Sequence, residues 1–96
     1  MDTRNYQAFL AVAELGSFSK AAETLFITQP AVSKRIATLE SLLGSPVFDR
    51  AGHSILLNEA GRALLPIAQR IIRDIEESRR VLANLNGKIS GQLSLV

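Results

Sequence analysis

Residues that break helices divide the first 44 positions of this chain into three short segments, and that division constrains the fold more than any other feature of the sequence. Helices are predicted over residues 4–15, 20–26 and 29–43 from their apolar spacing and flanking residues. Gly16 and Gly44 follow the first and third segments, where glycine readily adopts the left-handed backbone that ends a helix. The second and third segments, joined by a tight turn, form a helix-turn-helix pattern.

The starts of these helices carry residues whose side chains accept hydrogen bonds from free backbone N–H groups. Asp2 or Thr3 can cap the first helix, Ser19 the second and Thr28 the third. Pro30 falls in the first turn of the third helix, where its missing N–H costs nothing. These signals place the start of the third helix between Thr28 and Pro30.

After Gly44 the apolar pattern changes from helical to strand-like. Residues 47–50 and 54–57 form two short strand-like runs. The intervening residues 51–53 include Gly52, and a glycine-containing connection of this length indicates a β-hairpin. A hairpin that follows a helix-turn-helix is typical of the wing in a winged helix-turn-helix domain.

The rest of the chain is predicted to form one long helix. Asn58 can cap its start, and the helix is expected to continue to about Asn86, with Gly87 ending it. Pro66 lies inside this helix and is expected to bend it or fray its first turns. Residues 91–96 look like an entering strand with no partner. The predicted fold is therefore mainly α, with three helices and a hairpin wing before a long helix.

The helix predicted over residues 29–43 presents two different faces. On a helical wheel, its apolar face holds Val32, Ile36, Leu39 and Leu43. The opposite face carries small or polar side chains and one cation: Gln29 at the N-terminal tip, Pro30, Ser33, Lys34, Ala37 and Ser41, with Thr38 at one edge. No carboxylate occurs between residues 24 and 39. Such a face is either merely solvated or suited to a nucleic acid.

The chemistry of this polar face matches that of a helix that reads the DNA major groove. Gln29 can bond adenine through two hydrogen bonds, Ser33 can bond either kind of base, and Lys34 can reach guanine or a phosphate. Small neighbouring side chains let the backbone approach the bases, and the amides at a helix N-terminus favour phosphate. The preceding helix-turn-helix pattern and the following hairpin favour DNA reading over simple solvation.

Residue types needed for catalysis or metal binding are nearly absent. The chain has no cysteine and one histidine, His53, and its acidic residues are scattered, so no triad, metal-ligand set or carboxylate pair can be identified. No glycine-rich phosphate loop or signal peptide is evident, and no apolar run approaches the roughly 18–20 residues of a membrane span. We therefore expect a cytoplasmic, nucleoid-associated protein that is not an enzyme and has no membrane partner.

One stripe on the long helix alternates four and three residues apart, as the seam of a coiled coil does. Its members are Leu64, Ala68, Ile71, Ile75, Ser78, Leu82 and Leu85. The stripe packs either on its own domain or on a second copy of the chain; because it extends past the reach of so small a domain, we expect a homodimer. A helical interaction module that does not bind DNA is the competing interpretation, but it explains neither the 29–43 face nor the hairpin.

Residues 1–61 resemble the N-terminal domain of LysR-type transcriptional regulators. The match extends at fixed spacing over Phe9, Val12-Ala13, Gly16-Ser17-Phe18-Ser19-Lys20-Ala21-Ala22, Leu25, Thr28-Gln29-Pro30-Ala31-Val32-Ser33, Ile36, Leu39-Glu40, Leu43-Gly44, Phe48, Arg50, Leu57 and Ala60-Gly61. Molybdate-responsive regulators have a similar domain, but the spacing fits the LysR type better. The resemblance implies a winged helix-turn-helix domain (1–61), a linker and dimerisation helix (62–87), and the start of an absent effector-binding domain (88–96).

The resemblance also implies residue roles. DNA contacts carry over to Gln29, Pro30, Ser33 and Lys34 in the third helix and to Arg50 in the wing, with phosphate contacts at Thr28 and Thr38. Lys20, near the start of the second helix, is a further phosphate candidate. Arg35 lies beside the apolar face and is expected either to reach a phosphate or to lie along the surface, and not to read a base. His53 lies where many members have arginine, so only a weak contact is expected there, whereas Asn58 replaces a usual threonine with another good N-cap.

The implied partners follow from the same resemblance. They are double-stranded DNA with an interrupted palindromic operator, a second copy of the chain (or a tetramer of the full-length protein), and RNA polymerase. No cofactor is expected in this fragment, and a small-molecule effector is expected to bind the absent C-terminal domain.

Overall fold

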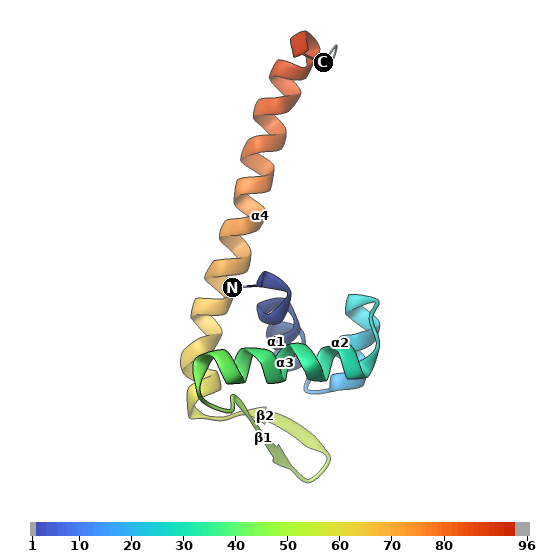
Figure 1. The fold of residues 1–96 in the computed structure, drawn as a ribbon, viewed down its shortest axis with the longest axis vertical. Coiled ribbons are helices and arrows are strands. Elements are labelled where there is room, and N and C mark those ends of the chain that lie inside the picture. The colour runs from blue at the N-terminus through green and yellow to red at the C-terminus, as the bar shows by residue number, and fades with distance from the viewer. Residues whose placement is uncertain (1, 94–96) are drawn as a thin grey trace.

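The computed structural model describes residues 2–93, with side chains described up to residue 86. A small domain of three helices and a hairpin is followed by a long helix that extends away from it (Figure 1). The elements are α1 (Thr3–Leu15), α2 (Phe18–Leu25), α3 (Gln29–Leu43), β1 (Phe48–Ala51), β2 (Ser54–Leu57) and α4 (Glu59–Leu93). The prediction of a mainly α, winged helix-turn-helix fold with a long C-terminal helix is confirmed.

Local capping explains where α1 and α3 begin and end. The Asp2 carboxylate accepts the backbone N–H of Arg4 at 2.9 Å, and the Thr28 hydroxyl accepts the N–H three residues further on at 3.2 Å. Gly16 (φ +65°) and Gly44 (φ +75°) end the two helices in the left-handed conformation. The caps predicted at these positions are confirmed.

The second helix begins two residues earlier than predicted. Ser17, and not Ser19, is its N-cap, because the Ser17 hydroxyl accepts the N–H of Lys20 at 3.2 Å. Phe18 is thereby the first helical residue, and its ring lies 6.3 Å from that of Phe48 in the hairpin. The prediction of Ser19 was wrong because this contact with a distant strand helps to decide between two equally good capping residues.

The core lies where α1, α2, α3 and the start of α4 meet. Its buried apolar side chains are Tyr6, Ala8, Phe9, Val12, Ala21, Ala22, Val32, Ile36, Leu39, Val47 and Ala68. The predicted apolar face of α3 is confirmed at Val32, Ile36 and Leu39. It was wrong at Leu43, which is 41% exposed because it is the last residue of the helix and lies at the margin of the core.

The hairpin is antiparallel and ends in a two-residue turn. Ala51 pairs with Ser54, so Gly52 and His53 form the turn, and Gly52 has φ +62°. The hairpin prediction is confirmed, although β1 begins at Phe48, one residue later than predicted. The Phe48 ring, 5.4 Å from that of Phe9, anchors the hairpin on α1.

The long helix is capped as predicted but ends later. The Asn58 side-chain oxygen accepts the N–H of Gly61 at 2.8 Å, and the helix is regular from Glu59 onward, so Pro66 does not fray its first turns. The predicted end at Gly87 was wrong, since α4 continues to Leu93. A glycine inside a helix costs only about 1 kcal/mol, which the backbone hydrogen bonds on both sides can offset. Residues 91–93, predicted as a strand, belong to the helix, and residues 94–96 lie outside the described chain.

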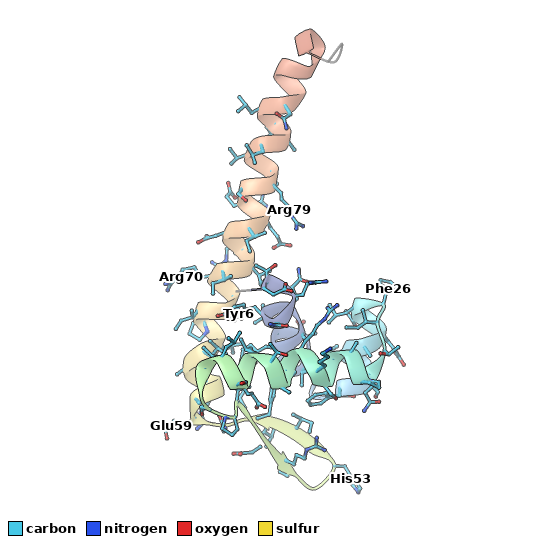
Figure 2. All side chains as sticks on the ribbon, in the orientation of Figure 1. Tyr6, Phe26, His53, Glu59, Arg70 and Arg79 are labelled. Atoms are coloured by element: carbon cyan, nitrogen blue, oxygen red, sulfur yellow. The ribbon has the colours of Figure 1, made fainter. Side chains whose placement is uncertain are left out.

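Phe26, which ends α2, has a conformation that a different residue would adopt more easily. It has φ +58°, and its side chain is 94% exposed and points away from the domain (Figure 2). Asparagine adopts this left-handed backbone conformation at a lower energetic cost than phenylalanine does. We expect Phe26→Asn to raise the free energy of unfolding by up to about 1 kcal/mol in urea denaturation. Phe26→Ala, which retains the strain, should change it little; a less stable Phe26→Asn variant would contradict this account of the turn.

Candidate nucleic-acid interface

The α3 helix crosses the small domain between the hairpin on one side and the start of α1 on the other (Figure 1). The side chains predicted to face outward from its first half, Gln29, Pro30, Ser33 and Lys34, are all exposed. Ala37 is exposed too, so the middle of this face carries little bulk. The helix therefore presents a narrow polar ridge that another molecule can approach closely.

A hollow of about 210 Å³ lies between α3, the start of α2 and the hairpin; we call it the wing-side hollow. It is lined by Gly16, Ser17, Phe18, Ser19, Gln29, Ser33, Arg50, His53 and Ile55. Four residues predicted from the sequence (Gln29, Ser33, Arg50 and His53) thus come together from two elements. No carboxylate is among the lining side chains, so the surface suits an anionic partner.

Arg50 is held at the edge of the wing-side hollow by an aromatic ring. Its guanidinium carbon lies 5.9 Å from the centre of the Phe18 ring, a favourable cation–π geometry. The described residues contain no ion pair between Arg50 and the neighbouring Asp49. The arginine charge therefore remains available to a ligand in the hollow.

Ser17, Phe18 and Ser19 are part of this surface but were not predicted as site residues. The sequence signal for the two serines was their capping chemistry, which places polar groups at the exposed start of α2. Phe18 had no such signal, because its role depends on the hairpin folding back beneath it.

A second hollow, of about 330 Å³, lies on the opposite edge of α3, and we call it the α1-side hollow. It is lined by Asp2, Arg4, Asn5, Ala31, Lys34, Arg35 and Thr38. The Thr38 hydroxyl donates to the Lys34 carbonyl at 2.9 Å, so it must turn away from that carbonyl to donate to a phosphate. Thr28 and Lys20 are exposed but line neither hollow.

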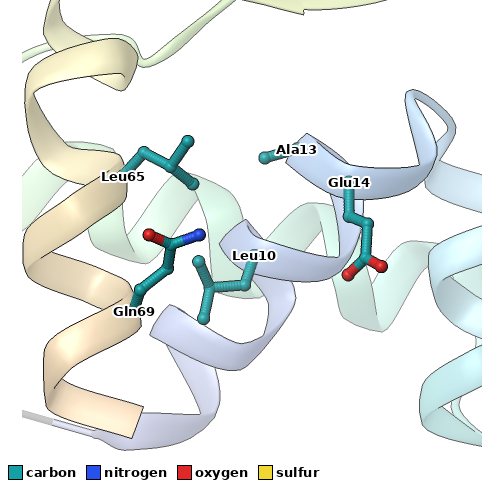
Figure 3. A pocket seen from close by; sticks show the side chains of 5 residues that line it. All are labelled: Leu10, Ala13, Glu14, Leu65 and Gln69. Carbon is teal, nitrogen blue, oxygen red and sulfur yellow. The ribbon is translucent and has the colours of Figure 1, made fainter. Parts of the chain in front are cut away.

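A third hollow, of about 410 Å³, lies between α1 and α4, with α3 on the far side of α1 (Figure 3). It is lined by the apolar side chains of Leu10, Ala13 and Leu65 and by the polar side chains of Glu14 and Gln69. Its one charged side chain is a carboxylate, which repels phosphate. This hollow is therefore not the nucleic-acid interface.

The described part of the chain gives no sign of a metal site. Within residues 2–86, no group of three histidine, cysteine, aspartate or glutamate side chains is placed to hold a metal ion. None of the helices in the described part of the chain is long and apolar enough to cross a membrane.

The residues predicted to pair two copies of α4 occupy two kinds of surroundings. Ala68 is fully buried, and Leu64 and Ile71 pack against the core of their own domain. Ile75 is half-buried, whereas the last three predicted positions, Ser78, Leu82 and Leu85, are exposed.

Two further apolar side chains of α4 are exposed and were not predicted: Ile67 at 48% and Val81 at 53%. Ile67, Asp74 and Val81 are spaced seven residues apart. A search for heptad repeats on the face of α4 next to the predicted stripe would have found them. The apolar surface that α4 leaves uncovered therefore includes Leu82 and Leu85 of the predicted seam and extends beyond it to Ile67 and Val81.

Comparison with known proteins shows what the chain resembles. The family model described as bacterial regulatory helix-turn-helix protein, lysR family, matches residues 3–62. A relative from Azotobacter vinelandii, described as an uncharacterized HTH-type transcriptional regulator in the ibpB-leuC intergenic region, is 59% identical over 95 residues, covering 99% of this chain and 66% of the relative. The HTH-type transcriptional activator CmpR of Synechocystis is 40% identical over 90 residues, covering 94% of this chain and 30% of CmpR.

A solved structure in a DNA complex, that of CbnR_DBD, is also similar, with a TM-score of 0.79 and 35% identity. The match covers 88% of this chain and 99% of the solved one. This chain therefore corresponds in extent to that solved domain, but it spans only about two thirds of the Azotobacter relative and less than a third of CmpR.

Proposed function

This chain belongs to the LysR family of bacterial helix-turn-helix regulators and is a DNA-binding domain rather than an enzyme, and from that premise we propose that it recognises an interrupted palindromic operator as a homodimer. In this proposal α3 enters the major groove, and the hairpin contacts the adjacent minor groove or backbone. The observation that carries it is the wing-side hollow, where the polar side chains Gln29 and Ser33 and the cationic side chain of Arg50 line one carboxylate-free surface.

The dimensions and chemistry of α3 support its place in the major groove. A helix with its side chains is about 10–12 Å across, close to the roughly 12 Å width of that groove. Gln29 lies at the exposed N-terminal tip, where recognition helices typically meet bases, and Ala37 lets the helix sit deep. Lys34 carries a charge that can bond guanine or a phosphate.

The hairpin supports the second contact. Arg50 projects from β1 over Phe18 toward the hollow, and His53 lies exposed at the turn (Figure 2). An arginine in this position can enter a narrow minor groove or bind a phosphate. His53 supplies a smaller contribution, because an imidazole offers a phosphate fewer N–H donors than the fork of a guanidinium does.

Exposed apolar side chains beyond the small domain support a homodimer. Val81, Leu82 and Leu85 are each about half exposed, on the part of α4 that extends away from the other helices (Figure 1). In a single chain this surface would face water, which is unfavourable. Pairing two α4 helices covers it and presents two reading heads to two half-sites.

Further partners are proposed for the full-length protein. Because the chain spans 30% of CmpR, we propose that a C-terminal domain follows α4 and binds a small-molecule effector. The full-length protein would act on the nucleoid in the cytoplasm, as a dimer or tetramer, and contact RNA polymerase when it regulates transcription. No cofactor is proposed for residues 1–96.

Base reading by α3 predicts the effect of a single substitution. In Gln29→Ala, preference should be relaxed by roughly 1–3 kcal/mol at one base position of each half-site, because the amide that pairs with adenine is lost. The measurement is binding to single-base variants of a duplex selected from a random library by the wild-type chain. Gln69→Ala is the matched control, because it makes the same change at an exposed glutamine on α4, beside the hollow that is not the nucleic-acid interface. An unaltered preference profile for Gln29→Ala would show that this residue does not read sequence.

A further inference from the structure

We propose that the α1-side hollow is a second phosphate site, which binds the backbone of the DNA strand opposite to the one that the wing contacts. This inference rests on the proposed entry of α3 into the major groove. It adds Arg4, at the start of α1, to the DNA-binding residues and gives Arg35 a defined partner.

The charges that line the α1-side hollow suit a phosphate. Arg4, Lys34 and Arg35 supply three cations, and Asp2 supplies the one carboxylate of the lining. The hollow therefore has an excess of two positive charges. Arginine is suited to phosphate because its planar guanidinium presents several N–H donors in a fixed fork.

Asp2 holds Arg4 in place without using all of its donors. The Arg4 Nε lies 3.2 and 3.1 Å from the two carboxylate oxygens, and Nη2 lies 2.7 Å from the second. A guanidinium has five N–H donors, so others remain for a phosphate oxygen. The hydrogen bonds from Arg4 lower the pKa of Asp2 to about 2. The carboxylate is therefore ionised near neutral pH and continues to accept these hydrogen bonds.

A structural role does not account for this ion pair. The two side chains are 65% and 42% exposed, and ion pairs in water contribute little to stability. The backbone N–H that Asp2 caps belongs to Arg4 whatever its side chain is. The guanidinium is therefore dispensable for the fold and available for a ligand.

The position of the two hollows on α3 matches the two strands of a duplex. At about 100° per residue, Gln29 and Ser33 lie on one edge of the helix, and Lys34 and Thr38 lie on the other. Ala37 lies between the two edges. A helix in the major groove has one phosphate backbone on each side, so the wing-side hollow meets one strand and the α1-side hollow meets the other.

The experiment compares how strongly the salt concentration affects DNA binding by single variants of the full chain. For Arg4→Ala and for Arg35→Ala, the slope of log affinity against log salt should become shallower by about one, and affinity should fall similarly on all sequences. Arg70→Ala removes the same charge from the exposed side of α4 away from α3 (Figure 2) and should behave as wild type. Circular dichroism checks that each variant is folded.

Phosphate-ethylation interference then assigns the strands. In wild type, ethylation should interfere on both strands of a half-site; Arg4→Ala should lose interference on one strand and Arg50→Ala on the other. If wild type binds duplex DNA but Arg4→Ala and Arg35→Ala match Arg70→Ala, the second phosphate site is wrong and the proposed function stands. If wild type shows no salt-dependent binding, both are overturned. Loss of interference by Arg4→Ala on the strand that Arg50 contacts would also overturn the site.

Discussion

Leu82→Asp is expected to give a folded monomer that has lost most of its affinity for an operator with two half-sites. Leu82 is 55% exposed in the single chain and lies beyond the small domain, so the substitution leaves the core intact. In a paired α4 seam, the new carboxylate would be buried without a partner, which is strongly unfavourable. Aspartate costs under about 1 kcal/mol in helix propensity, so α4 itself should persist.

The loss of binding follows from the loss of linkage between two reading heads. Linked sites gain about 10²- to 10⁴-fold in apparent affinity through effective concentration, and a monomer forfeits that gain. Analytical ultracentrifugation measures the oligomeric state, and binding to one isolated half-site should be nearly unchanged. Leu82 is a better test position than Ile75, because Ile75 is half-buried in the single chain.

A matched control lies about half a turn away on the same helix. Asn84 is exposed, and at about 100° per residue it lies on the side of α4 opposite to Leu82. Asn84→Asp therefore adds the same negative charge at nearly the same distance from the domain, with almost no change in side-chain size. It should remain dimeric and bind as wild type does. If Leu82→Asp also remains dimeric and binds normally, the exposed apolar surface of α4 is not the dimer interface.

Gly61→Ala is expected to lower the free energy of unfolding by about 2–3 kcal/mol, or the melting temperature by roughly 10–20 °C. A methyl group on Gly61 would lie 2.1 Å from the carbonyl oxygen of Val47 and 2.8 Å from a methyl of Leu57. The Val47 carbonyl also accepts the N–H of Asn58 at 3.1 Å, which ties the hairpin to α4. Making room for the methyl group must pull these backbones apart, so the wing should also lose its position.

Gly44→Ala separates this clash from the ordinary cost of losing a glycine. Gly44 has φ +75° and no atom within 4 Å of the added methyl group, so only backbone strain of about 1 kcal/mol is expected. Thermal denaturation of both variants gives the comparison. Equal stability of the two variants would contradict the close approach of α4 to Val47.

The parts of the fold that depend on neighbours in sequence were predictable. Asp2, Thr28 and Asn58 act as N-caps because their side chains reach N–H groups two or three residues away. The choice between Ser17 and Ser19 was not predictable, because both have the same chemistry and the contact of Phe18 with the hairpin is non-local.

The candidate site was predictable in its centre but not at its margins. Periodicity alone assigned Gln29, Ser33 and Lys34 to the exposed face of α3. It could not assign Arg4, which is 30 residues from Lys34 in sequence and reaches the same hollow because α1 packs against α3.

The stripe on α4 shows a related limit of periodicity. Ala68 and Leu82 fall on the same heptad pattern, yet the first is buried in its own domain and the second is exposed. The heptad pattern indicates that one face of α4 is apolar. It does not indicate whether the chain's own domain or a second copy of the chain covers that face. The small domain covers α4 only over the turns that it reaches, and apolar side chains beyond those turns stay exposed in the single chain.

The most direct test of DNA reading by α3 is an NMR titration of the chain with a selected operator duplex, following the backbone amide shifts. The largest changes should fall on residues 17–20, 29–38 and 50–54, which surround the wing-side hollow and the exposed face of α3. Amides around the hollow between α1 and α4, such as those of Ala13 and Gln69, should move little. Changes concentrated at that hollow, or none along α3, would contradict the proposed interface.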